Sequence, residues 1–163
     1  FTVTTGMTAS PFDCWLAERG MLSFDLRFDR AQSTAAQLAE HLSGLKGITR
    51  VLYPGRPDHP DYDRAKALLG TNFCNMVSFE LSGARPAANA FTRAAEGLCF
   101  APTLGDVGTT ISHPASSSHR ALTETQRLDL GISEGFFRIS VGLEAPDVLC
   151  AVFSDAVAAA AGH

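Results

Sequence analysis

One arginine near the end of the chain lies among residues that are typical of a buried strand. The segment FFRISVGLE, residues 136–144, is largely apolar and carries Arg138 near its centre. Burying a guanidinium without a partner is unfavourable, because its charge leaves water without compensation. Arg138 is therefore either paired with an acid of this chain, such as Glu144 or Asp147, or free to bind an external anion. Because a guanidinium binds a carboxylate through two parallel hydrogen bonds, the second alternative predicts a carboxylate site.

A second candidate is the connection FAPTLGDVGTT, residues 100–110, between two predicted strands. Its glycines, its proline and its small polar residues allow backbone N–H groups to face a ligand. Connections of this composition are more often simple turns. Composition therefore leaves both interpretations open, a ligand-binding loop and a simple turn.

Two histidines, His113 and His119, lie in the segment SHPASSSH. A spacing of six does not place two metal ligands on one face of a helix, and Pro114 interrupts any helix between them. We interpret both histidines as structural.

Length and charge restrict the kind of protein. A chain of 163 residues with 45% hydrophobic residues is long enough for one hydrophobic core. The net charge of -4, without a basic stripe, argues against nucleic-acid binding. No apolar run approaches the roughly 20 residues of a membrane span, and no signal peptide is evident. We predict that the cysteines, which form no C-x-x-C pair, are reduced and mostly buried in a cytoplasmic protein: Cys14, Cys74, Cys99 and Cys150.

The elements that position these residues follow from periodicity and from cap signals. Ser10 and Pro11 predict the start of a first helix with Trp15 as its core anchor. In the last helix we expect Val148, Val152 and Val157 on the core side. Helices are predicted near residues 10–20, 24–42, 60–70, 86–97, 123–131 and 146–160, and strands near 48–55, 75–82, 98–102, 108–114 and 136–143. This order suits a small sheet covered by helices on one face.

Five segments together resemble the Cys/Met-metabolism family of pyridoxal-phosphate (PLP) enzymes, in order and in spacing. This family includes cystathionine gamma-synthase, cystathionine gamma-lyase, methionine gamma-lyase and the O-acyl-homoserine sulfhydrylases. The segments are SPFDCWLAERGM, RVLYPGRPDHPDYDRAK, MVSFEL, FAPTLGDVGTTISHPASSSHR and GISEGFFRISVGLEAPDVL.

The resemblance implies an α/β (α+β) fold, namely the small C-terminal domain of fold-type I PLP enzymes. Such a domain has a small, mostly antiparallel sheet with helices on one face and is preceded by a long connecting helix. We expect connecting helices over residues 1–44 and the small domain over residues 45–163, with the N-terminal PLP-binding domain absent from this chain.

The resemblance also implies site residues. Arg138 matches the arginine that binds the α-carboxylate of the amino-acid substrate. Thr103, Leu104 and Gly105 match the family's Ser-Leu-Gly, whose first residue lies beside that carboxylate. Pro102 occupies the position at which members differ by reaction type, so the choice between γ-replacement, γ-elimination and β-elimination stays open.

The lysine that binds PLP as a Schiff base lies upstream in the family, and neither Lys46 nor Lys66 matches its motif. The resemblance therefore implies that PLP is held mainly by the absent domain, and that this segment contributes no catalytic residue. We expect the isolated chain to be inactive and the full-length protein to be a homotetramer acting on sulfur amino acids or O-acyl-homoserines. The alternative is a stand-alone, non-catalytic binding or assembly module, against which a start at Phe1 argues.

Overall fold

A five-stranded sheet forms the centre of the computed structural model, which describes residues 2–6 and 8–162. The strand order is β1-β2-β5-β4-β3, and every neighbouring pair is antiparallel except β3 and β4. The strands are β1 (Ile48–Leu52), β2 (Met76–Leu81), β3 (Cys99–Phe100), β4 (Thr110–Ser112) and β5 (Phe136–Ser140). The predicted mixed fold with a mostly antiparallel sheet is confirmed.

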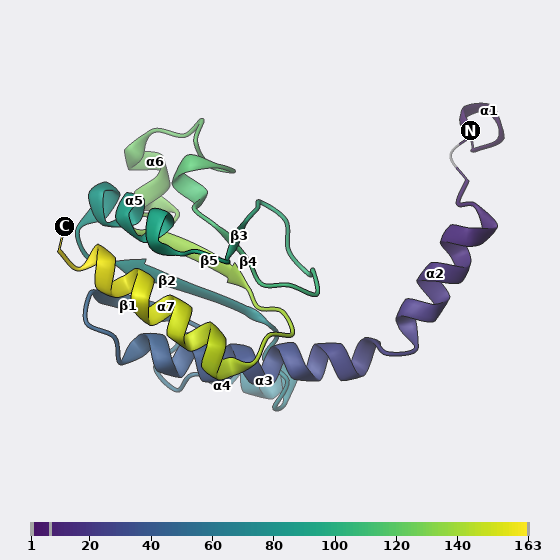
Figure 1. Ribbon diagram of the computed structural model, residues 1–163, viewed down its shortest axis with the longest axis horizontal. Helices are drawn as coiled ribbons and strands as arrows, with labels where there is room; N and C mark the ends of the chain where they lie inside the picture. Colours follow the sequence, from purple (N-terminus) through teal and green to yellow (C-terminus); the bar gives the residue numbers. More distant parts are fainter. Residues whose placement is uncertain (1, 7, 163) are drawn as a thin grey trace.

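The helices follow the predicted order, with one short helix added at the N-terminus and one 3-10 turn added after β4. They are α1 (Thr2–Thr5), α2 (Pro11–Met21), α3 (Phe24–Ser43), α4 (Tyr62–Leu69), α5 (Ala84–Ala94), η1 (Pro114–Ser116), α6 (Glu124–Asp129) and α7 (Pro146–Ala160). Figure 1 shows α3 and α7 running along the sheet, while α2 extends away from the body of the molecule.

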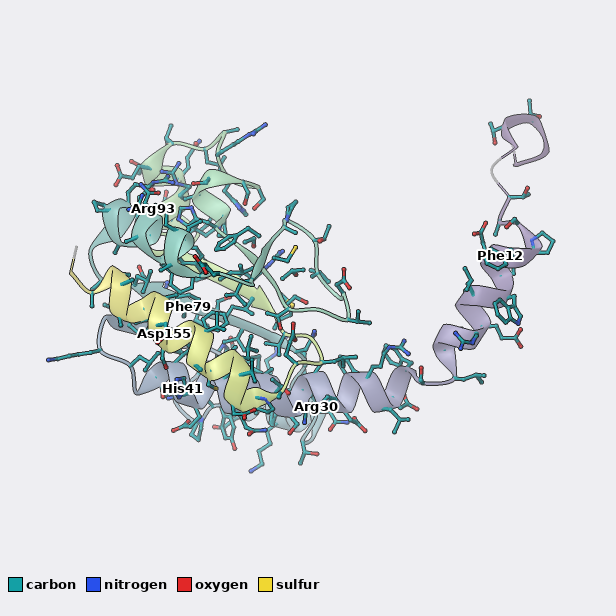
Figure 2. The ribbon with its side chains drawn as sticks, viewed as in Figure 1. Phe12, Arg30, His41, Phe79, Arg93 and Asp155 are labelled. Atoms are coloured by element: carbon teal, nitrogen blue, oxygen red, sulfur yellow. The ribbon has the colours of Figure 1, made fainter. Side chains whose placement is uncertain are left out.

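The two faces of the sheet differ in character. Along β2 the side chains alternate, so that Val77, Phe79 and Leu81 are buried and the residues between them are partly exposed. The buried face packs against α3, α5 and α7. Phe79 lies within this core (Figure 2), where rings at positions 79, 91, 137 and 153 contact one another with centroids 4.8 to 6.0 Å apart. The opposite face is free to carry polar side chains.

The prediction for the core side of α7 is confirmed for Val157 and wrong for Val148. Val148 is 58% exposed and Val152 is only partly buried, whereas Leu149, Phe153 and Val157 are buried. Leu149, Phe153, Ala156 and Ala160 recur at three- and four-residue spacing, so they form one stripe of the helix. The larger Leu and Phe side chains occupy the core, and Val148 is turned to the solvent.

The prediction for the first helix was right about its start and wrong about its tryptophan. Ser10 caps α2 and forms a capping box with Asp13, as its sequence indicates. No residue of α2 is buried, however, and Trp15 is 54% exposed. Figure 2 shows Phe12 of the same helix away from the body of the molecule. The apolar side of α2 therefore has no partner within the described part of the chain.

Three further expectations concern the exposure of the cysteines, membrane-spanning helices and the domain boundary. The four cysteines are free, but Cys14 and Cys99 are exposed and the other two are partly buried, so the prediction of mostly buried cysteines is wrong. Cys14 lies on the extended helix α2 and Cys99 on the two-residue strand β3, which explains their exposure, whereas Cys150 of α7 packs against the edge of the core. Among the described residues, no helix has the length and apolar character needed to cross a membrane. The boundary between residues 1–44 and 45–163 stays a prediction.

Candidate functional site

The sheet register places Arg138 between two serines. Arg138 lies on the central strand β5, where it pairs with Ser78 of β2 on one side and with Ser112 of β4 on the other. Residues paired in this way project from the same face of the sheet. Within the described part of the chain, the hydroxyls of both serines make no hydrogen bond. This polar row lies on the face opposite α3, α5 and α7.

The guanidinium of Arg138 is held by backbone oxygens and not by an acid. Its Nη2 donates to the carbonyl oxygens of Pro102 at 3.1 Å and of Thr103 at 3.5 Å. Its Nε is buried and has no hydrogen-bond partner among the described residues. Arg138 consequently keeps N–H groups that make no hydrogen bond in the described chain and that could donate to a carboxylate.

The acids that could have neutralised Arg138 are occupied elsewhere or exposed. Glu144 accepts hydrogen bonds from the backbone N–H of Thr109 at 2.6 Å and from its hydroxyl at 2.8 Å. Glu80, on the same face as Arg138, pairs with Arg50 at 3.0 Å. Asp147 is exposed in the first turn of α7. Of the two alternatives raised by the sequence, an internal ion pair is therefore excluded for the described residues.

The loop from Pro102 to Gly105 borders this guanidinium. The carbonyl oxygen of Thr103 also accepts a hydrogen bond from the hydroxyl of Thr110 at 3.2 Å. Pro102 and Thr103 therefore reach Arg138 through their backbone oxygens. Leu104, which the resemblance placed beside the site, is 60% exposed and makes none of these contacts.

The glycine that follows Ser140 and Val141 allows a close approach of two segments. A Cβ on Gly142 would lie 2.5 Å from the carbonyl oxygen of Val107. The N–H of Gly142 donates to the hydroxyl of Thr109 at 2.9 Å, which ties the end of the loop to the end of β5. The Ser-Val-Gly sequence after Arg138 thus lets this loop lie against the strand that carries the arginine.

A cavity of about 270 Å³ lies beside the loop. It shares Pro102 and Ser112 with the surroundings of Arg138, although Arg138 itself does not line it. The remaining lining residues are Asn89, Thr92, Phe100, Ala101, Ile111, His113, Ser116 and Ser117. The polar row of Arg138, Ser78 and Ser112 therefore has a cavity next to it on the β4 side.

The histidine segment is structural at His113. Its Nε2 lies 2.9 Å from the carbonyl oxygen of Glu134 and its Nδ1 lies 2.8 Å from the hydroxyl of Ser116. Because a carbonyl oxygen can only accept, Nε2 carries the proton. Burial lowers the pKa of His113, so the neutral ring is favoured. Among the described residues, no three histidine, cysteine or acidic side chains are grouped as metal ligands.

The pattern G-x-S-x-G of serine hydrolases occurs as GISEG, residues 131–135, and was missed among the sequence-based predictions. In such enzymes the serine lies on a sharp turn from a strand to a helix. Here Ser133 lies in the connection from α6 to β5, and its hydroxyl accepts a hydrogen bond from the N–H of Gly135 at 3.2 Å. The segment is a turn that begins β5.

The family model described as "Cys/Met metabolism PLP-dependent enzyme" matches residues 1–158. The chain belongs to this family. The O-succinylhomoserine sulfhydrylase of Pseudomonas aeruginosa is 38% identical over 159 residues, which are 98% of this chain and 39% of that protein. The L-methionine gamma-lyase of Pseudomonas putida is 38% identical over 157 residues, covering 96% of this chain and 39% of that protein.

A solved member of the Cys/Met-metabolism family has the same fold. The crystal structure of cystathionine gamma synthase from Xanthomonas oryzae pv. oryzae, in complex with aminoacrylate and cysteine, matches with a TM-score of 0.85 at 35% identity. The match covers 98% of this chain and 41% of that one. The present chain thus spans about two fifths of the length of these relatives.

The sequence predictions identified Arg138, Pro102 and Thr103, which the structure brings together. They missed the two serines that flank the arginine. The alternation in MVSFEL already placed Ser78 on the partly exposed face of its strand. Its position opposite Arg138, and that of Ser112, depends on the register between strands that are distant in sequence. No local pattern reports that register.

Proposed function

We propose that this chain supplies the substrate carboxylate site of a PLP-dependent enzyme that acts on sulfur amino acids or O-acyl-homoserines. In this proposal Arg138 binds the α-carboxylate, and the hydroxyls of Ser78 and Ser112 flank it. One observation carries the proposal. The guanidinium lies on the central strand, has a buried and unpaired Nε, and has no acidic partner within the described residues.

The chemistry of the site suits a carboxylate. A guanidinium offers several donors in a plane, and hydroxyls can donate to a second oxygen lone pair. The aminoacrylate and the cysteine in the related Xanthomonas oryzae structure both have an α-carboxylate. That ligand class supports the proposal for this chain.

The described residues do not fit the cofactor itself. Both lysines, Lys46 and Lys66, are exposed, and neither lies on the strands of the polar row. An exposed amine lacks the desolvation that activates a Schiff-base lysine. We therefore propose that PLP, which supplies the electron sink of the family's reactions, is held mainly by polypeptide outside this chain. The chain alone is expected to be inactive.

Arg138 has a binding and orienting role. A carboxylate held by charge-assisted hydrogen bonds keeps its negative charge and a fixed rotation about its bond to the α-carbon. Loss of that group as carbon dioxide would leave the guanidinium without its partner, so decarboxylation is disfavoured. Arg138 transfers no proton in this scheme, because an arginine stays charged in proteins.

Arg138→Ala in the complete protein tests the proposed carboxylate role. Removing a hydrogen bond to a charged group costs about 1.5–3 kcal/mol, so kcat/KM should fall at least about tenfold. The measurement uses L-methionine and O-succinyl-L-homoserine, the substrates named by the two relatives. Arg138→Lys should lower kcat/KM by less than Arg138→Ala does. Lysine keeps the positive charge but lacks the planar set of donors.

The matched control is Arg93→Ala. Arg93 is an exposed arginine of α5 that has no ion-pair partner among the described residues, and Figure 2 shows it on the surface of the body. Its removal should leave kcat/KM unchanged. Unchanged kinetics in Arg138→Ala would contradict the proposed carboxylate role.

A further inference from the structure

The loop that borders Arg138 has little packing to hold it. Residues 102–107 are exposed, and a Cβ added to Gly105 would meet no atom within 4 Å. A second cavity, of about 200 Å³, lies against Gly105, Asp106 and Val107 on the side of α3. Because the loop has space to move into, its position depends on hydrogen bonds.

One of these hydrogen bonds comes from β5 itself. The hydroxyl of Ser140, which is 2% exposed, accepts the N–H of Gly105 at 2.9 Å. Ser140 lies two residues after Arg138, so both side chains project from the same face of the strand. The bond therefore ties the loop to the strand that carries the guanidinium.

Asn75 holds Ser140 in turn. Its Nδ2 donates to the carbonyl oxygen of Val141 at 2.8 Å and to the hydroxyl of Ser140 at 3.4 Å. The carbonyl of Val141 can only accept, which fixes the amide nitrogen on that side. The N–H of Val141 also donates to the backbone oxygen of Asn75 at 2.9 Å. Asn75 and Gly105 therefore both donate to the hydroxyl oxygen of Ser140, and Asn75 helps to fix that oxygen beside the loop.

The loop is held by two separate sets of hydrogen bonds, one to Arg138 and one to Ser140. Nη2 of Arg138 donates to the carbonyl oxygens of Pro102 and Thr103. A carboxylate at the guanidinium competes with these carbonyl oxygens for the Nη2 donor, so the loop needs other anchors to stay in place. The bond from Gly105 to Ser140 is such an anchor and does not involve Arg138.

We propose that Asn75 and Ser140 are positioning residues for the carboxylate site, holding the loop 102–105 in place while Arg138 releases its carbonyl oxygens to bind substrate. This inference rests on the proposed function of Arg138. Neither residue touches the substrate in this scheme. Loss of either lets the loop move into the adjacent cavity or follow the guanidinium, so that its carbonyl oxygens compete with the substrate carboxylate.

The test uses Asn75→Ala, Ser140→Ala and the double variant of the complete, cofactor-loaded protein, with Asn72→Ala as the control. Asn72 is an exposed asparagine whose side chain makes no hydrogen bond in the described chain. Titration calorimetry measures the binding of L-alanine, which has the α-carboxylate, and of L-alaninamide, which lacks it. Loss of one hydrogen bond corresponds to about a fivefold weaker affinity for L-alanine in each single variant.

Three results would support the proposal together. The affinity for L-alaninamide stays unchanged, the double variant is no weaker than Ser140→Ala because the two residues act as one unit, and Asn72→Ala binds like the unchanged protein. In the cofactor-free protein, amide hydrogen exchange of the peptide spanning residues 102–107 should be faster in both single variants. Equal losses for both ligands, or unchanged L-alanine affinity, would overturn it.

Arg138→Ala separates the two proposals. If that variant loses L-alanine affinity while Asn75→Ala and Ser140→Ala do not, the carboxylate site stands and the positioning role is wrong. If Arg138→Ala also binds L-alanine normally, the proposed function itself is wrong.

Discussion

Arg138 illustrates how one side chain on a central strand is kept available. Its neighbours in register are serines, which are too short and uncharged to neutralise it. The nearby acid Glu144 is bound by the N–H and the hydroxyl of Thr109. Within the described chain, Arg138 stays unpaired because a nearby acid already binds other groups, and not because acids are distant from it in the sequence. The family membership and this geometry together support a carboxylate role.

Tyr53 gives a prediction at the same scale. It is buried, and its hydroxyl donates to the carbonyl oxygen of Cys74 at 3.2 Å. Burial, followed by the charge of the ionised Cys74 thiol, raises the pKa of Tyr53 to about 12. Between the ordinary pKa of about 10 and this value, the unfolded chain releases the proton and the native chain keeps it. Stability should therefore fall as pH rises through that range.

The measurement is an ultraviolet titration of tyrosinate. The chain has two tyrosines, so the difference between the unchanged protein and Tyr53→Phe isolates Tyr53. Its midpoint should lie near 12, with circular dichroism confirming that the fold persists over the titration. A midpoint at the ordinary tyrosine value would show that the hydroxyl is not buried.

At the scale of elements, the segment between β4 and β5 is held by polar contacts. The carboxylate of Glu134 forms ion pairs with both Arg85 of α5 and Arg127 of α6. Arg85 also donates to the hydroxyl of Ser116, which is free to donate its proton to Nδ1 of His113. These contacts connect η1, α5, α6 and the start of β5. The serine-rich composition of residues 116–118 gives no sign of this network.

The pKa of His113 makes this segment sensitive to acid. Burial lowers it, the hydrogen bond to Glu134 opposes this, and the charges of Arg85 and Arg127 reinforce the lowering. Below the ordinary value of about 6.5, the unfolded chain binds a proton that the native ring resists. We expect the urea midpoint to fall as pH decreases below this value. His113→Gln, which has no proton to gain, should reduce that dependence, and an identical dependence would contradict the assignment.

At the scale of the whole molecule, the body and the arm differ in how they are stabilised. The body has a continuous core of sheet and helices, whereas α2 exposes the large apolar side chains of Phe12, Trp15 and Leu16. Exposed apolar groups gathered on one element indicate a surface that another polypeptide covers. Because the chain spans about two fifths of its relatives, we propose that the rest of the complete protein covers α2. A homotetramer of the complete protein stays a proposal, testable by sedimentation.

Trp15 reports on this arm, because it is the only tryptophan of the chain. The emission of Trp15 should lie at longer wavelength in this chain, where the ring is half exposed, than in the complete protein. In each case subtraction of the Trp15→Phe variant isolates its signal. Equal emission and equal quenching by acrylamide in the two proteins would mean that α2 stays uncovered.

Much of this fold follows from local sequence. The capping box of Ser10 and Asp13 fixes the start of α2, and the alternation in MVSFEL separates the two faces of β2. Both signals act over a few residues, so no tertiary contact is needed to read them. Residue type alone is a weaker signal in α7, where Val148 is exposed and Val157 is buried.

The sequence by itself determined the family, the order of the elements and the arginine on which the proposed function depends. Tertiary structure alone decided that Arg138 has no acidic partner among the described residues, that two serines flank it, and that Ser140 is hydrogen-bonded to both Gly105 and Asn75. The physical reason is that pairing depends on strand register and on competition among distant side chains. Those quantities exist only once the sheet has formed.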